Sequence, residues 1–181
     1  CIVAEHAGFC QGVRRTIMTI EELLRSSTGT IYSIGLPIHN PQLTERLTQQ
    51  GLKVVSELDE IATGTLVVRA HGLPPSLLHE ARDRGITIVD ATCAFVVKAQ
   101  KIAHELFKSK YNVIIAGEKE HPEVRSLLGF TDNSALVCQR VEDVRSIHAD
   151  GRYGILSQTT FSEHVYKDLL AVLLHKHFRE L

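Results

Sequence analysis

The sequence is poor in several residue types, and these shortages exclude whole classes of protein. It has no tryptophan, 1 methionine and only 4 cysteines in 181 residues. The cysteines are too sparse for a disulfide-stapled secreted domain, and none forms the Cys-x-x-Cys pair of a structural zinc site. Long hydrophobic runs are also missing: runs such as 112–116 are far shorter than the roughly 20 residues that a membrane span requires.

The chain also lacks an excess of either charge. Its 20 Lys and Arg balance 21 Asp and Glu, for a net charge of −1, and no basic tract stands out. This balance argues against a duplex nucleic-acid binder that works by neutralising phosphates. Hydrophobic residues at 44% and charged residues at 23% exclude disordered, collagen-like and mucin-like chains. We therefore expect a globular protein of the reducing cytoplasm, whose free cysteines are buried, bind metal or take part in catalysis.

Short β-branched runs alternate with longer amphipathic segments along the chain. Most of the runs are almost continuously apolar, which is typical of parallel strands buried on both faces. We expect strands at residues 2–4, 31–34, 52–55, 65–69, 87–90, 112–116, 135–138 and 153–156. The alternation predicts an α/β fold with mainly parallel sheets, arranged as two small three-layer α/β/α domains.

Apolar residues at intervals of three or four predict helices between these strands. The clearest sets are Val13, Ile17, Ile20 and Leu24; Ala99, Ile102, Ala103 and Leu106; and Val165, Leu169, Val172 and Leu173. Asn40 and Pro41 are typical of a helix start, and Gly51 is typical of its end. We place the boundary after residue 95, which gives domains 1–95 and 96–181. The chain opens on Cys1 rather than methionine, which suggests processing or trimming.

Reactive side chains follow six of the expected strands. They are Cys10, His39, His71, Cys93, His121 together with Glu123, and Thr159. In parallel α/β sheets, ligands bind beyond the carboxyl ends of the strands, where helix N-termini also favour anions. Taken singly, each residue has a simpler explanation, such as a buried thiol, a capped turn or an acidic first helical turn. Their recurrence at equivalent places favours one shared site.

The residue types at these positions suggest a particular chemistry. Two cysteines from separate parts of the chain, without Cys-x-x-Cys spacing, suit an iron–sulfur cluster better than structural zinc. Histidines and helix N-termini suit a diphosphate, while a glutamate can move a proton that a hydroxyl orients. Gly8 and Gly12 flank Cys10 and allow the backbone to approach a ligand closely. Cys138 has no such surroundings, and we expect it to be a packed thiol.

Six motifs occur in order along the chain. They are Gly8-Phe-Cys-Gln-Gly-Val13, Ile38-His-Asn40, Ala70-His-Gly72, Asp90-Ala-Thr-Cys93, His121-Pro-Glu-Val124 and Gln158-Thr-Thr160. In these motifs the sequence resembles the 4-hydroxy-3-methylbut-2-enyl diphosphate reductase (LytB/IspH) family. The resemblance covers essentially all 181 residues but only the first two-thirds of the family's usual length. It departs at Ala94, where the family has proline, and at Ser126, where the family has glycine.

The resemblance implies a pseudo-threefold, three-domain architecture around a [4Fe–4S] cluster, with the third domain absent from this chain. Cys10 and Cys93 match two of the three cluster ligands, and the third cysteine ligand is not in this chain. The chain on its own is therefore expected to be truncated and incompetent for turnover. The missing C-terminal domain and a ferredoxin- or flavodoxin-like electron donor are the partners that the resemblance implies.

The resemblance also assigns roles to the remaining site residues. His39, His71, His121 and Thr159 match substrate-binding positions; Glu123 and Thr159 match catalytic ones, with Glu123 delivering a proton. The implied reaction removes the allylic hydroxyl of 4-hydroxy-3-methylbut-2-enyl diphosphate with two electrons and protons. Isopentenyl and dimethylallyl diphosphates are the products, in the terminal step of the non-mevalonate isoprenoid pathway.

Three other functions remain open. One is a non-catalytic diphosphate-binding remnant, or an assembly subunit, of the same fold; the presence of Glu123 and Thr159 argues against it, because pure binding requires neither. A second is an iron–sulfur enzyme of the quinolinate synthase type, which the His-Pro-Glu and Gln-Thr-Thr motifs disfavour. A zinc hydrolase is the weakest, because the histidines and cysteines lack local ligand spacing.

Overall fold

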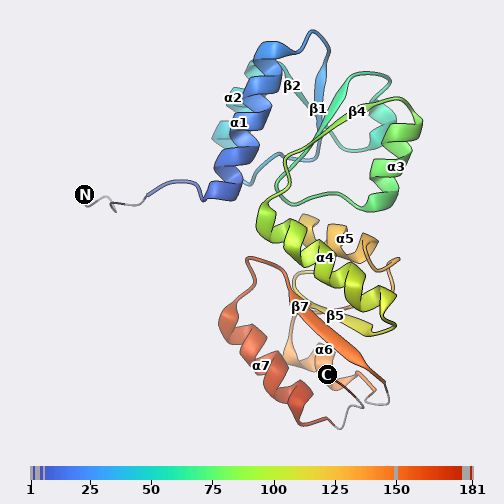
Figure 1. Cartoon of the computed structure of the whole chain (residues 1–181). Helices are drawn as coiled ribbons and strands as arrows, with labels where there is room; N and C mark the ends of the chain where they lie inside the picture. The colour runs from blue at the N-terminus through green and yellow to red at the C-terminus, as the bar shows by residue number, and fades with distance from the viewer. Residues whose placement is uncertain (1, 3–4, 6, 149–150, 177–179, 181) are drawn as a thin grey trace. The chain divides into compact units, whose positions relative to one another are not determined.

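The computed structural model describes every residue except 1, 3–4, 6, 149–150, 177–179 and 181 (Figure 1). The chain forms two compact units: unit 1 comprises Cys1–Gly72 and Leu77–Ala94, and unit 2 comprises Leu73–Ser76 and Phe95–Leu181. The functional division into domains 1–95 and 96–181 stays a prediction. The strand expected at 2–4 lies mainly on residues outside the described ones.

Unit 1 contains a parallel sheet of four short strands in the order β2-β1-β3-β4. The strands are β1 (Ile31–Ile34), β2 (Leu52–Val55), β3 (Thr65–Val68) and β4 (Thr87–Asp90). Each neighbouring pair is parallel, as the apolar runs predict. The carboxyl ends of all four strands therefore lie at one edge of the sheet.

Three α-helices and one 3-10 turn cover this sheet (Figure 1). They are α1 (Gln11–Ser26), α2 (Pro41–Gln49), η1 (Leu58–Glu60) and α3 (Pro75–Asp83). Ile20 of α1 and Leu47 of α2 are fully buried in one cluster with Ile31, which confirms the predicted apolar face of α1. The helix start at Asn40 is also confirmed, because its side-chain oxygen accepts a hydrogen bond from the Leu43 N–H at 2.9 Å.

Unit 2 contains a parallel sheet in the order β6-β5-β7, which repeats the order of the first three strands of unit 1. The strands are β5 (Asn112–Ala116), β6 (Leu136–Cys138) and β7 (Tyr153–Ser157). At the outer edge of β7, Glu180 forms a parallel bridge with Arg152, and its carbonyl accepts from the Tyr153 N–H at 2.8 Å. The parallel arrangement predicted from the sequence is confirmed in both units.

Helices lie on both faces of the unit 2 sheet. They are α4 (Ala94–Lys108), α5 (Pro122–Gly129), α6 (Val141–Arg145) and α7 (Glu163–Leu174). Ile114 and Ile115 alternate across β5, so that Ile115 packs with α4 and α5 residues while Ile114 packs with Leu169 of α7. Ile102 was expected on the buried face of α4, which was wrong: it is 38% exposed, because that face runs through Ala99 and Ala103 instead.

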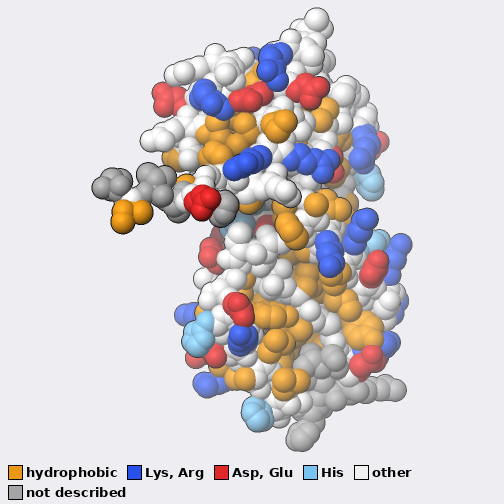
Figure 2. Space-filling model, turned by 60° about the vertical axis from the view of Figure 1, so that its left-hand side comes forward, with side chains coloured by type: hydrophobic (Ala, Val, Ile, Leu, Met, Phe, Trp, Pro, Cys, Tyr) orange, Lys and Arg blue, Asp and Glu red, His pale blue; other side chains and the backbone are white. Residues whose placement is uncertain are grey.

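The surface of the described chain carries both signs of charge. Figure 2 shows lysines and arginines interspersed with acidic side chains on the face drawn, in keeping with the net charge of −1. Within the residues that the structure describes, no helix combines the length and apolar character needed to cross a membrane.

Candidate functional site

The two candidate cluster cysteines both lie at helix N-termini. Cys10 directly precedes α1, and Cys93 directly precedes α4. A side chain on Gly12 would place its Cβ 2.5 Å from the Cys93 Sγ, so only glycine allows this sulfur to approach the first turn of α1. Cys10 is exposed, Cys93 is half-buried, and both are free thiols. The structure thus brings the Cys93 sulfur to the start of the helix that Cys10 precedes.

Two side chains that the sequence did not single out support these cysteines. Thr16, on the buried face of α1, donates from Oγ1 to the Ala91 carbonyl at 2.8 Å and so ties this helix to the segment before Cys93. Arg14 donates from Nε to the Phe9 carbonyl at 2.8 Å and braces the segment before Cys10. Arg14 and Thr16 lie four and six residues after Cys10, a spacing that does not mark them in the sequence. Their roles are seen only in the hydrogen bonds of the folded chain.

His39 and His71 lie side by side in unit 1. His39 follows β1 and His71 follows β3, and their ring centroids are 4.7 Å apart with an interplanar angle of 49°. Gly35, with φ of +68°, begins the loop that carries His39, and a Cβ there would lie 2.5 Å from the Arg69 guanidinium. Arg69 also donates to the Leu36 carbonyl at 3.3 Å. The structure thus places two imidazole rings together in the loops after β1 and β3, where their N–H groups can bind an anionic ligand.

The buried Glu123 and the exposed Thr159 form a hydrogen-bonded pair in unit 2. The Thr159 N–H donates to Oε1 of Glu123 at 2.7 Å, and the Thr159 hydroxyl donates to Oε2 at 2.8 Å. The glutamate is only 1% exposed. Burial raises the pKa of the Glu123 carboxyl above its ordinary value of 4.5, and the two hydrogen bonds from Thr159 offset part of that rise. The pair can therefore hold a proton on an oriented carboxyl group.

His121 caps the helix that carries Glu123. Its Nδ1 accepts a hydrogen bond from the Glu123 N–H at 3.2 Å, and Pro122 occupies the first turn of α5, as the sequence predicts. An imidazole that accepts through Nδ1 has its proton on Nε2, a tautomer assigned here from this hydrogen bond. Nε2–H is then the donor that the His121 ring can direct toward an anion. Sequence reasoning missed this cap because histidine is not among the usual N-cap residues.

Gln158 is a further residue that the sequence did not single out within the Gln-Thr-Thr motif. Its side chain is 4% exposed, its Oε1 accepts from the Glu118 N–H at 3.1 Å, and its Nε2 donates to the Thr160 hydroxyl at 2.9 Å. A Cβ on Gly117 would lie 3.1 Å from the Gln158 Oε1. The amide therefore joins the loop after β5 to the loop after β7.

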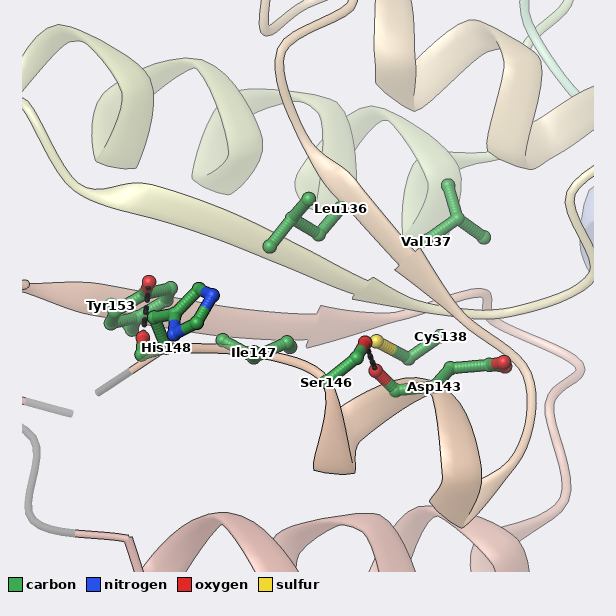
Figure 3. Close-up of a pocket in the computed structure, with 8 residues that line it drawn as sticks. All are labelled: Leu136, Val137, Cys138, Asp143, Ser146, Ile147, His148 and Tyr153. Atoms are coloured by element: carbon green, nitrogen blue, oxygen red, sulfur yellow. Dashed lines mark hydrogen bonds between the residues drawn. The ribbon is translucent and has the colours of Figure 1, made fainter. Parts of the chain in front are cut away.

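The Cys138 side chain lines a cavity of about 440 Å3 at β6, the edge strand of the unit 2 sheet (Figure 3). The Tyr153 hydroxyl donates to the His148 carbonyl at 2.7 Å on one side of this cavity. Burial, with a smaller contribution from Asp143, raises the pKa of the Cys138 thiol to about 11. The thiol is 2% exposed, which confirms the expectation of a packed cysteine and leaves it unsuited to be a thiolate ligand.

The structure thus groups the predicted residues within each unit. It places His39 beside His71 and Cys93 against the first turn of α1 in unit 1, and it bonds Glu123 to Thr159 in unit 2. Thr159 is not the cap of the following helix, since Ser162 caps α7. The convergence of all these residues on one site stays a prediction.

The chain is similar to curated 4-hydroxy-3-methylbut-2-enyl diphosphate reductases. A curated 4-hydroxy-3-methylbut-2-enyl diphosphate reductase from Alkaliphilus oremlandii is 39% identical over 176 residues, which cover 97% of this chain and 63% of the relative. A second, from Dictyoglomus turgidum, is 42% identical over 161 residues, covering 88% of this chain and 56% of the relative. The chain therefore spans about 60% of the length of these relatives.

A solved structure agrees with this similarity. The structure of (E)-4-hydroxy-3-methyl-but-2-enyl diphosphate reductase, described as the terminal enzyme of the non-mevalonate pathway, is 35% identical and has a TM-score of 0.84, covering 98% of this chain and 64% of that one. The family model described as LytB protein matches residues 1–181. By sequence and by fold, the chain belongs to the LytB family.

Proposed function

We propose that this chain supplies the substrate-binding and proton-donating parts of a reductase that acts on 4-hydroxy-3-methylbut-2-enyl diphosphate. The observation that carries the proposal is the Glu123–Thr159 pair, because a buried carboxyl with both oxygens hydrogen-bonded is arranged for proton transfer. The activity for which the curated relatives are named supplies the substrate class. Since the chain spans about 60% of those relatives, the activity is proposed for the longer protein.

In the proposed reaction the allylic C–O bond breaks, and the hydroxyl leaves as water after it takes up one proton. Two electrons from a ferredoxin- or flavodoxin-like donor enter the allylic group, and a second proton adds to carbon to give isopentenyl or dimethylallyl diphosphate. Glu123 supplies the proton to the leaving hydroxyl, and Thr159 holds the carboxyl in place by its backbone N–H and hydroxyl. Burial favours the protonated form of Glu123, which this step requires.

Cys10 and Cys93 fit the role of cluster ligands. Both precede helices, whose N-termini favour negative charge, and the missing side chain of Gly12 leaves room beside the Cys93 sulfur. A [4Fe–4S] cluster bound there would relay electrons to the substrate. Cys138 is buried and does not fit this role, and the family resemblance implies a third cysteine ligand in the part of the relatives that lies beyond the match.

The three histidines fit the diphosphate. His39 and His71 form a close pair, and His121 presents its Nε2–H from the N-terminus of α5. Helix N-termini and imidazole N–H groups both favour phosphate oxygens. We propose that these three rings bind and orient the substrate through its diphosphate, and that Thr159 contacts the reacting end.

The proposal is tested by joining the chain to the C-terminal part of a relative. Residues 1–181 are fused to the C-terminal part of the Alkaliphilus oremlandii relative, reconstituted anaerobically with iron and sulfide, and assayed with a reduced viologen. We expect a cluster and both diphosphate products from the fused protein, and no turnover from residues 1–181 alone. A fused protein with a full cluster that binds substrate without forming either product would instead support the non-catalytic diphosphate-binding alternative.

A further inference from the structure

We propose that Gln158 is a positioning residue, whose side-chain amide holds together the two loops that present Glu123 and Thr159. Glu123 follows the loop after β5, and Thr159 lies in the loop after β7. Their hydrogen bonds thus connect residues 36 apart in sequence, and something must fix the spacing of the two loops. The inference rests on the proposed proton-donating role of Glu123.

The strands themselves cannot fix this spacing. Pairing between β5 and β7 ends with Ala116 beside Ser157, and the last backbone bond joins the Gln158 N–H to the Ala116 carbonyl at 2.8 Å. Among the described residues, no further backbone hydrogen bond joins the two loops beyond that point. The Gln158 side chain links the two loops where the backbone pairing has ended. Its Oε1 accepts from the Glu118 N–H in the first loop, and its Nε2 donates to the Thr160 hydroxyl in the second.

Close packing leaves the amide little freedom. The side chain is 4% exposed, and Gly117 faces it with so little space that a Cβ there would lie 3.1 Å from the Gln158 Cβ and 2.7 Å from the Val124 Cγ2. Functional groups must be held within about 0.5 Å of their working geometry by residues that are themselves fixed. Gln158 meets that condition for the Glu123–Thr159 contact, although nothing in the structure requires it to touch substrate.

Unit 2 offers a matched control for this role. Gln100 of α4 is 7% exposed, and its Nε2 donates to the Ser126 hydroxyl at 2.9 Å. It is therefore a second buried glutamine with one side-chain hydrogen bond, but it joins α4 to α5 rather than the two loops. Replacing either glutamine by methionine keeps the length of the side chain and removes its hydrogen bonds, so Gln100→Met controls for the loss of a buried side-chain hydrogen bond in the same unit.

The test follows the Thr159 amide in 15N-labelled residues 1–181 by NMR. We expect Gln158→Met to speed hydrogen exchange at this amide by about tenfold and to remove the dependence of its chemical shift on the titration of Glu123. In Gln100→Met, the exchange rate of the Thr159 amide should stay within about twofold of that in the unmodified chain, and its chemical shift should still follow the titration of Glu123. An unchanged Thr159 amide in folded Gln158→Met, or an equal change in Gln100→Met, would overturn the proposal.

A milder variant keeps the test informative should Gln158→Met fail to fold. Thr160 is exposed, so Thr160→Val removes only the oxygen that accepts from the Gln158 Nε2. We expect about threefold faster exchange at Thr159, and no change would contradict the proposal. These measurements involve no turnover, so an inactive fused protein with a normal Thr159 response would count against the proposed function while leaving the positioning role intact.

Discussion

Unit 1 and unit 2 share a strand order, but among the predicted site residues only Glu123 of unit 2 is fully buried. In unit 1, Cys10 and His39 are exposed, and Cys93 and His71 are only half-buried. In unit 2, Glu123 is 1% exposed and accepts two hydrogen bonds from Thr159 within the fold. Under the proposed function, unit 1 thus presents accessible thiols and imidazoles for a cluster and a diphosphate, while unit 2 holds a preformed Glu123–Thr159 pair for proton transfer.

This difference follows from what each kind of group must do. A thiol or imidazole that binds a cluster or a diphosphate has to be accessible, and its own fold gains little from it. A carboxyl that must hold a proton near neutral pH has to be desolvated, which makes it part of the core. Substitutions in unit 1 should therefore affect binding with little change in stability, whereas substitutions of the unit 2 pair should affect both.

The largest effect is expected at the cluster ligands. In the fused protein, Cys93→Ser should abolish stable cluster assembly, whereas Cys138→Ser should leave the iron and sulfide content unchanged because that thiol is buried. Iron and sulfide analysis after anaerobic reconstitution measures both. Thermal unfolding of residues 1–181 without cluster should be little altered by Cys93→Ser. Clear destabilisation by Cys93→Ser would contradict the expectation that the ligand residues of unit 1 contribute little to stability.

The next largest effect is expected at the proton donor. Glu123→Gln keeps the shape of the side chain but removes the transferable proton, so turnover by the fused protein should fall by about 100-fold or more. Cluster content should be preserved. Glu120→Gln is the matched control, since Glu120 lies in the same loop but is exposed and paired with Arg125. Equal rates for Glu123→Gln and Glu120→Gln would rule out Glu123 as the donor.

A smaller effect is expected on anion binding. His71→Ala in residues 1–181 should weaken binding of inorganic diphosphate by about tenfold, because it removes a charge-assisted hydrogen bond. His164→Ala is the control, since the His164 side chain is 87% exposed on α7. Calorimetric titration measures both affinities. If His71→Ala and His164→Ala bind diphosphate equally well, the imidazole pair of unit 1 does not form the anion site.

The smallest effect concerns stability against pH. Burial raises the folded pKa of Glu123 above 4.5, so its protonated form stabilises the fold. That contribution is fully present below pH 4.5 and is lost as pH rises through the folded pKa. The free energy of unfolding in urea is measured against pH for the unmodified chain and for Glu123→Gln. The difference between the two should decline as pH rises. The pKa of Asp143 is lowered, mainly by the hydrogen bond from the Arg140 N–H, so its contribution to stability changes with pH in the opposite direction. Both proteins contain Asp143, so its contribution cancels in the difference.

The fold could be predicted wherever local patterns coincide with burial. Periodic residues such as Ile17 and Ile20 marked α1, and Asn40 marked the start of α2, because apolar spacing and capping act within one element. The short helices η1 and α6 were missed, since three and five residues are too few to show a period. Ile102 was misplaced because four apolar positions on α4 define a wider stripe than the sheet covers.

The candidate site could be predicted by residue type but not by geometry. Glu123 and Thr159 were both expected as site residues, yet the two bonds between them depend on loops 36 residues apart. The Nδ1 cap of His121 and the Gln158 amide bridge were missed, because each is a tertiary or unusual local contact that no spacing encodes. Sequence thus indicates which groups are present, and packing decides which of them are held in place.

The most direct test is a 13C NMR titration of the Glu123 side-chain carboxyl in residues 1–181. The contrast between the units depends on this group being desolvated and preorganised before any ligand binds. We predict a pKa above the ordinary value of 4.5, with the Thr159 amide following the same transition. A Glu123 pKa at or below 4.5, or a Thr159 amide indifferent to that titration, would contradict the account.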